Sequence, residues 1–143
     1  MTPGASINNG SKLGIIAGEG DLPARIIAAC RDRGRPFFVL ALEGRTAPEA
    51  VGDTPHAWVR LGAAGKAIKL LRREKVEELV LAGPVSRPTL AELKPDLWAA
   101  KFLARKGKKI FDDADGLMAA LIREMEETEG FRVLQPETLL ANP

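Results

Sequence analysis

Short, continuous apolar runs alternate with amphipathic segments along this chain, and this alternation restricts its fold more than any other feature. The apolar runs have the length of buried strands: Lys12–Ala17, Pro36–Leu42, Ala57–Leu61, Glu78–Ala82 and Phe131–Leu134. The segments with helical spacing are Asp21–Arg33, Ala64–Lys75, Asp96–Lys106 and Asp113–Glu129. Strands that are apolar throughout are typical of a parallel sheet covered by helices on both faces. The pattern therefore predicts an α/β, Rossmann-like three-layer sandwich with a mostly parallel sheet of about five strands.

Residue types at the ends of the first predicted helix support its bounds. We expect Asp21 to cap the N-terminus and Gly34 to end the helix. Pro23 falls in the first turn, where its missing N–H costs nothing. Segments 44–55 and 83–95 are rich in proline and glycine, so they are predicted loops, the second with at most one helical turn.

The composition is that of one globular domain. The chain has 143 residues, of which 45% are hydrophobic and 28% charged, which excludes disorder for most of its length. The 21 Lys and Arg residues nearly balance 19 Asp and Glu, which is not typical of a nucleic-acid binder. The single cysteine, Cys30, excludes a disulfide framework and fits a cytoplasmic protein. No apolar run reaches the ~18 residues of a membrane span, and residues 1–11 are expected to be a flexible tail.

Parallel strands place the loops that follow them at one edge of the sheet, where ligands bind in this class of fold. Three such loops are candidates for function: Gly18–Asp21, Gly62–Lys66 and Gly83–Pro88. The first has two glycines before a helix N-terminus, which suits a phosphate. However, Pro23 stands where the third glycine of a G-x-G-x-x-G motif belongs, and a tight strand-to-helix turn explains the loop equally well.

The other two loops each carry a cation. Gly65 and Lys66 begin a helix, but the loop is too short for a Walker A motif and lacks its Ser or Thr, which disfavours nucleoside-triphosphate hydrolysis. Lys66 is either a partner for an anion or a solvated lysine. Arg87 lies between Pro84 and Pro88, whose fixed φ angles are expected to hold it for bidentate contact with phosphate.

The remaining polar residues have simpler explanations. Carboxylates near a helix N-terminus are favourable without any function, and this accounts for the cluster Asp112, Asp113 and Asp115. A metal site would require several of their oxygens to converge. His56 is the only histidine and has no nucleophile near it in the sequence, so a catalytic triad is unsupported.

A basic cluster follows Trp98 near the end of a predicted helix. Such a pattern either contacts an anionic membrane surface or is a solvated helix end that favours cations. The cluster lies beside Phe102 and consists of Lys101, Arg105, Lys106, Lys108 and Lys109.

Several sequence phrases occur in the order found in a known family. They are LGIIAGEGDLP at 13–23, GK at 65–66, AGPVSRP at 82–88, LKPD at 93–96 and EGFRV at 129–133. From Lys12 to Leu140 the sequence resembles the N-terminal domain of UDP-2,3-diacylglucosamine pyrophosphatase, an enzyme of bacterial lipid A (lipopolysaccharide) biosynthesis. The resemblance implies a substrate-binding domain over residues 12–140 and a catalytic C-terminal domain beyond residue 143.

The resemblance also implies a reaction and a site. Water attacks the α-phosphorus of UDP-2,3-diacylglucosamine to give lipid X (2,3-diacylglucosamine 1-phosphate) and UMP, with Mg²⁺ or Mn²⁺ in the full-length enzyme. This chain is expected to hold no metal and no catalytic residue. Its expected partners are the substrate or lipid X and the C-terminal domain, while contact with the inner face of the inner membrane and a homo-oligomer stay open. The expected substrate-binding residues are Gly18, Gly20, Leu22, Gly65, Lys66, Gly83, Val85 and Arg87.

One departure from the family pattern bears on the phosphate site. Glu19 replaces the middle glycine of a usual Gly-Gly-Gly loop, and a carboxylate that faced a diphosphate would repel it. Glu19 must therefore point away, or the loop is not a phosphate cradle. The alternative function is a stand-alone nucleotide-binding or regulatory α/β module without catalysis. A receiver-like domain is disfavoured, because glycines follow the strands where a phospho-acceptor aspartate is needed.

Overall fold

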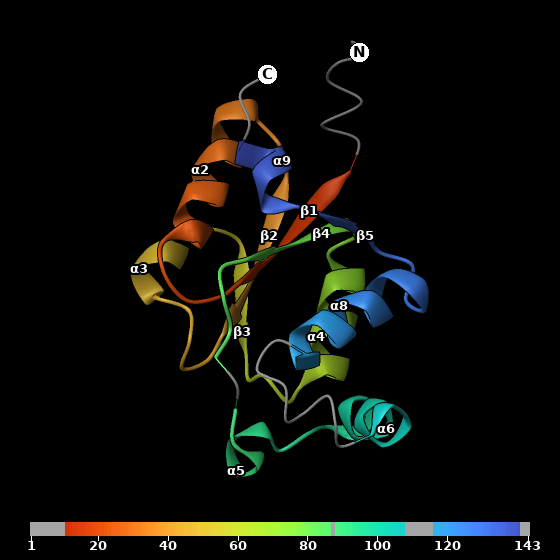
Figure 1. Ribbon diagram of the computed structural model, residues 1–143. Coiled ribbons are helices and arrows are strands. Elements are labelled where there is room, and N and C mark those ends of the chain that lie inside the picture. Colours follow the sequence, from red (N-terminus) through yellow and green to blue (C-terminus); the bar gives the residue numbers. More distant parts are fainter. Residues whose placement is uncertain (1–10, 87, 108–115, 141–143) are drawn as a thin grey trace.

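A computed structural model describes residues 11–86, 88–107 and 116–140 (Figure 1). Its centre is a five-stranded sheet in the order β3-β2-β1-β4-β5, and every neighbouring pair is parallel. The strands are β1 (Lys12–Ala17), β2 (Phe37–Leu42), β3 (His56–Val59), β4 (Val76–Ala82) and β5 (Arg132–Leu134). The predicted α/β three-layer arrangement around a parallel sheet is confirmed.

Helices cover both faces of the sheet. Figure 1 shows α2, α3 and α9 on one side of it and α4 and α8 on the other, with α6 beyond α4. No helix within the described residues has the length and apolar character needed to cross a bilayer. The described helices are α2 (Leu22–Arg33), α3 (Pro48–Val51), α4 (Ala64–Arg73), α5 (Leu90–Leu93), α6 (Leu97–Lys106), α8 (Gly116–Glu127) and α9 (Pro136–Leu140).

Two short helices were not predicted. Pro48 begins α3 inside the segment expected to be a loop, and Pro136 begins α9 after the last strand. Proline is a loop signal, but it is also favoured in the first helical turn, where its N–H has no intrahelical partner to lose. The single turn of α5 agrees with the prediction for segment 83–95.

Consecutive side chains of the central strands enter two separate cores, as expected for strands buried on both faces. Ile15 belongs to one core and Ile16 to the other. The first core joins the sheet to α2 and α9 and includes Leu13, Ile26, Ile27, Cys30, Val39, Val80 and Leu139. The second joins it to α4 and α8 and includes Leu40, Ala67, Ile68, Leu71, Leu79 and Met125.

The ends of α2 show where local signals succeed and fail. Gly34 ends the helix with φ of 65°, and Pro23 lies in its first turn, both as predicted. The prediction that Asp21 caps the helix is wrong, because its side chain makes no capping hydrogen bond. Its backbone is helical (φ −97°, ψ −4°), whereas a capping side chain usually needs extended backbone to reach the next N–H groups.

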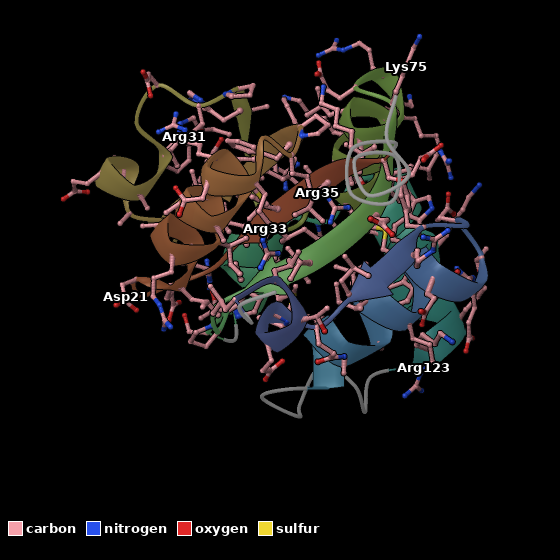
Figure 2. The ribbon with its side chains drawn as sticks, turned by 90° about the horizontal axis from the view of Figure 1, so that it is seen from above. Asp21, Arg31, Arg33, Arg35, Lys75 and Arg123 are labelled. Carbon is pink, nitrogen blue, oxygen red and sulfur yellow. The ribbon has the colours of Figure 1, made fainter. Side chains whose placement is uncertain are left out.

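A buried ion pair lies at the start of β4. Glu78 pairs with Arg35, which follows α2 and lies beside the sheet in Figure 2. The second carboxylate oxygen of Glu78 accepts a 2.6 Å hydrogen bond from Arg132 of β5. The side chains of Glu78 and Arg35 are 10% and 8% exposed, so each charge depends on the other for compensation.

Candidate functional site

The topological switch point of the sheet lies between β1 and β4. The chain builds β2 and β3 on one side of β1, then returns to place β4 and β5 on the other. In open parallel sheets, ligands bind outside the carboxyl ends of the strands at this point. The loops after β1 and β4, which begin at Gly18 and Gly83, flank it as predicted.

Two backbone hydrogen bonds join these loops. The Gly18 N–H donates to Ala82 O at 2.7 Å, and the Glu19 N–H donates to Pro84 O at 2.8 Å. A Cβ on Gly18 would lie 2.6 Å from the carbonyl oxygens of Gly83 and Pro84. Gly83 has φ of 96°, and a Cβ there would collide with the Glu19 carbonyl. Both glycines are thus required for loop-to-loop packing, while their contact with a ligand stays a prediction.

The Glu19 carboxylate strengthens this connection. Its Oε2 accepts hydrogen bonds from the Ser86 N–H at 3.1 Å and the Ser86 hydroxyl at 2.5 Å. Arg45 Nε lies 3.9 Å from the same oxygen and donates to Ser86 O at 3.1 Å. The hydrogen bond from the Ser86 hydroxyl and then that from the Ser86 N–H lower the pKa of Glu19. Burial raises it by less, and the Arg45 charge adds a smaller lowering effect. The carboxylate therefore points to Ser86 and Arg45.

The loop after β2 also reaches this edge of the sheet. The Thr46 hydroxyl donates to Ala17 O at 2.6 Å and accepts from the Leu42 N–H at 2.7 Å, so it ties the ends of β1 and β2 together. Thr46 is buried, and its neighbour Arg45 reaches the β4 loop. Sequence reasoning missed both residues. The one available signal, a threonine just after a strand, is weak because threonine is common in turns.

The remaining predicted residues of the first loop differ in their surroundings. Gly20 is exposed, has φ of 84° and has no atom within 4 Å of where a Cβ would lie. Its backbone is accessible to a ligand. Leu22 is half-buried and packs against the core beneath α2.

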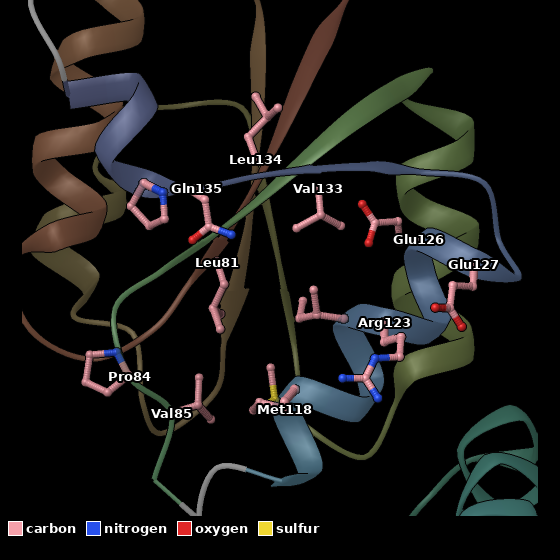
Figure 3. A pocket seen from close by; sticks show the side chains of 13 residues that line it. Leu81, Pro84, Val85, Met118, Arg123, Glu126, Glu127, Val133, Leu134 and Gln135 are labelled. Atoms are coloured by element: carbon pink, nitrogen blue, oxygen red, sulfur yellow. The ribbon is translucent and has the colours of Figure 1, made fainter.

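A groove of about 560 Å³ opens beside the β4 loop, between β4, β5 and α8 (Figure 3). Its floor is apolar and is formed by Leu81, Val85, Met118, Ile122 and Val133. Its rim is polar and carries Arg123, Glu126, Glu127 and Gln135. Of the residues predicted for the site and described by the structure, Val85 lines the groove. The rest of the lining was missed, because it depends on how α8 packs over the sheet.

Gly65 and Lys66 lie elsewhere, at the start of α4. They line a separate depression between α4 and α6. The Lys66 N–H donates to Asp96 Oδ2 at 3.2 Å, and Asp96 Oδ1 accepts from the Ala99 N–H at 2.9 Å. One carboxylate thus caps two helices. A Cβ on Gly65 would lie 2.8 Å from the Trp98 Cβ, so the glycine permits this close approach. The Lys66 side chain stays exposed.

Some predictions fall outside the described residues: those for Arg87, for residues 1–10 of the predicted tail, for Lys108 and Lys109 of the basic cluster, and for the acidic cluster Asp112, Asp113 and Asp115. Across residues 11–86, 88–107 and 116–140, no three His, Cys, Asp or Glu side chains converge as a metal site requires.

Comparison with known proteins supports the sequence resemblance. Residues 12–142 match the LpxI N-terminal domain family. Over 128 residues the chain is 39% identical to UDP-2,3-diacylglucosamine pyrophosphatase LpxI of Caulobacter vibrioides. The matched segment covers 85% of this chain and 43% of that relative. The chain therefore spans less than half the length of the relative. On this evidence, the chain belongs to the LpxI N-terminal domain family.

Proposed function

We propose that this chain is the N-terminal, substrate-binding part of a UDP-2,3-diacylglucosamine pyrophosphatase. In this proposal the full-length enzyme hydrolyses UDP-2,3-diacylglucosamine to lipid X and UMP in lipid A biosynthesis. Family membership and the identity to the Caulobacter protein support it. The structural observation that carries it is the apolar groove beside the joined β1 and β4 loops.

The groove suits a ligand with one apolar and one polar part. UDP-2,3-diacylglucosamine has two acyl chains on a sugar, which a diphosphate joins to uridine. The floor around Leu81, Met118 and Val133 offers an apolar surface, and polar side chains form the rim. The loops at the switch point lie next to it, where parallel sheets bind phosphates. We assign the acylated sugar to the groove and the diphosphate to the loops.

Four of the predicted residues have a role in this assignment. Gly18 and Gly83 fix the packing of the two loops, and Gly20 exposes its backbone to the diphosphate. Val85 forms an apolar wall of the groove. Leu22 packs against the core, and Gly65 and Lys66 line a separate depression, so this assignment gives them no contact with the groove. Arg87 lies outside the described residues and stays a predicted contact of the diphosphate. Ser86 orients the Glu19 carboxylate through two hydrogen bonds, and the Arg45 charge 3.9 Å away offsets its negative charge, which reduces its repulsion of an anion.

The divalent cation and the catalytic residues belong, in this proposal, to the C-terminal domain of the full-length enzyme. The described residues bring together no set of three metal ligands, so they do not fit a metal site. A cytoplasmic location is part of the same proposal.

Calorimetric titration of the chain with lipid X and with UDP tests the assignment. Val85→Asp puts a carboxylate on the groove wall and is expected to weaken lipid X binding about tenfold, because a charge in an apolar contact is costly. Ala28→Asp adds the same charge to an exposed position of α2 and serves as the matched control. Failure of the unmodified chain to bind lipid X, or equal losses in both variants, would contradict the proposal.

A stand-alone nucleotide-binding or regulatory module remains the competing function. The strand order and the switch-point loops favour it, since this arrangement binds many nucleotides. Such a module is expected to bind UDP as tightly as UDP-2,3-diacylglucosamine, and Val85→Asp is expected to leave both affinities unchanged. The difference between the affinities for UDP-2,3-diacylglucosamine and for UDP therefore distinguishes the two functions.

A further inference from the structure

The depression between α4 and α6 has a volume of about 570 Å³ and differs in character from the groove. Cations from both helices surround an apolar centre. Its lining includes Lys66 and Lys69 of α4 and Leu97, Trp98 and Lys101 of α6. We call these five residues the α4–α6 face.

Leu97 is the apolar centre of this face. It is 72% exposed, which sets it apart from the other large hydrophobic side chains in the described part of the chain. It is the first residue of α6, and the Asp96 carboxylate fixes that helix start through the Ala99 N–H. Trp98 next to it is half-buried and stacks on Phe102 with ring centroids 5.5 Å apart. Leu97 therefore projects from a well-held helix end.

The lysines of the face carry uncompensated charge. Lys66, Lys69 and Lys101 are exposed, and within residues 11–86, 88–107 and 116–140 none of them forms an ion pair. One carboxylate, that of Asp96, lines the same depression, and it accepts hydrogen bonds from two backbone N–H groups. Three positive charges against one negative charge leave the face cationic.

The two described cations at the end of α6 are paired and do not add free charge to the face. Arg105 and Lys106 on α6 lie 2.9 and 4.0 Å from the Glu124 carboxylate, which compensates them. Glu129, whose Oε2 lies 3.4 Å from Trp98 Nε1, is paired with Arg72 at 2.7 Å. Among the described basic residues of α6, Lys101 is therefore the one without an ion-pair partner.

We propose that the α4–α6 face binds the anionic surface of a lipid bilayer, with Leu97 entering the headgroup region and the three lysines contacting lipid phosphates. An apolar anchor among lysines is typical of segments that lie in a membrane interface. Each lysine close to an anionic surface strengthens binding by about fivefold. The positive charge of the face favours an anionic lipid surface as its partner. The inference rests on exposure and charge and does not depend on the proposed function.

Flotation of the chain with vesicles tests the proposal. Vesicles of phosphatidylcholine with about one third phosphatidylglycerol are compared with vesicles of phosphatidylcholine alone. We expect binding to the anionic vesicles only, weakened by added salt, which screens exposed charges. The triple variant Lys66→Glu, Lys69→Glu and Lys101→Glu is expected to abolish it, and Leu97→Ser to weaken it about tenfold.

A matched control reverses three exposed cations outside the face that have no ion-pair partner among the described residues: Arg25, Lys75 and Arg123, of which the last two lie apart in Figure 2. Both triple variants change the net charge from +2 to −4, since each substitution removes two units. The control is expected to retain most of the binding. Equal losses in the two triple variants, equal binding to neutral vesicles, or no vesicle binding would overturn the proposal, the last pointing to an acidic protein partner.

A spectroscopic measurement locates the contact without relying on affinity. In a Trp58→Phe background, Trp98 is the remaining tryptophan. We expect lipids brominated near the headgroup to quench the Trp98 emission. In the variant with the three lysines replaced by glutamate, the same lipids are expected to leave this emission unchanged. Binding without quenching would place the contact elsewhere and overturn the proposal. The vesicles contain no UDP-2,3-diacylglucosamine, so the result is separate from the test of the proposed function.

Discussion

The Glu19 carboxylate accepts two hydrogen bonds from one residue, Ser86, which lies on the loop at the other side of the switch point. Because Glu19 follows β1 and Ser86 follows β4, this contact joins loops that are 67 positions apart in the sequence. Backbone bonds from Gly18 and Glu19 run parallel to it. The candidate site is therefore built on two loops held as one unit.

Replacing Glu19 with alanine is expected to lower the free energy of unfolding by about 1 kcal/mol. Hydrogen bonds to a charged group usually contribute more, but this carboxylate is about one-third exposed and solvent screens it. Urea denaturation measures the change. Glu43→Ala, at an exposed position after β2, is the control and is expected to change stability little. Equal effects of the two substitutions would show that the loop contact contributes nothing.

The contribution of Glu19 is also expected to depend on pH. Its hydrogen bonds with Ser86 favour the ionised form and lower its pKa in the folded chain below the ordinary value of 4.5. A lowered folded-state pKa stabilises the fold above the unfolded-state pKa, and this stabilisation is lost as the pH falls through the folded-state value. The stability difference between the wild type and Glu19→Gln is therefore expected to be constant near neutral pH and to shrink below about pH 4.5. A difference that grows on acidification would contradict this sign.

Two glycines of the first loop are expected to respond differently to alanine. Gly18→Ala places a Cβ 2.6 Å from two backbone oxygens, which cannot move without breaking the loop contact, so we expect a loss of at least about 2 kcal/mol. Gly20→Ala meets no atom within 4 Å and incurs the strain of φ at 84°, about 1 kcal/mol. Denaturation of both variants measures the ranking, and the reverse order would refute the packing role of Gly18.

Removing one partner of the ion pair between Glu78 and Arg35 is expected to lower the free energy of unfolding strongly. Glu78→Gln leaves the buried Arg35 without a counter-charge and is expected to destabilise the chain by about 3 kcal/mol. Glu77→Gln, at the exposed neighbouring position, is the control. Replacing both partners, as Arg35→Met with Glu78→Leu, is expected to recover most of the loss, because neither charge then stays buried alone. Thermal and urea unfolding of the three variants measure this, and a double variant as unstable as Glu78→Gln would contradict it.

The sequence predicts the sheet because each central strand carries its own signal, a continuous apolar run such as Lys12–Ala17. Helix ends are less certain from local signals, since Pro48 marks both a loop and a first helical turn. The residues of the candidate site are even more difficult to predict from the sequence. Arg45 reaches Ser86 across 41 positions, and Met118 joins the groove only after α8 packs on the sheet. No local pattern encodes such contacts.

The same limit applies to the second predicted cation. The sequence predicts Lys66 to be either a partner for an anion or a solvated lysine, and it gives no sign that Asp96, 30 positions away, accepts a hydrogen bond from the Lys66 N–H. The backbone amide is thus already bonded, while the lysine side chain stays exposed. Sequence reasoning could not identify Asp96 as this acceptor, because tertiary packing brings it to the start of α4.

This chain is expected to release no UMP by itself from UDP-2,3-diacylglucosamine, even with Mg²⁺ or Mn²⁺. Hydrolysis of a pyrophosphate needs a cation that offsets phosphate charge and a group that removes a proton from the attacking water. The glycine amides of the switch-point loops donate hydrogen bonds and take no protons. The carboxylates on the groove rim, Glu126 and Glu127, meet no third metal ligand among the described residues. Glu19, the nearby carboxylate, has a lowered pKa and is bonded to Ser86, so it is a weak base. Chromatographic detection of UMP, with the Caulobacter enzyme as the positive control, measures the rate. Release at a rate comparable to that enzyme would place the catalytic residues within this chain, and the aspartates at 112, 113 and 115 would be the first to substitute.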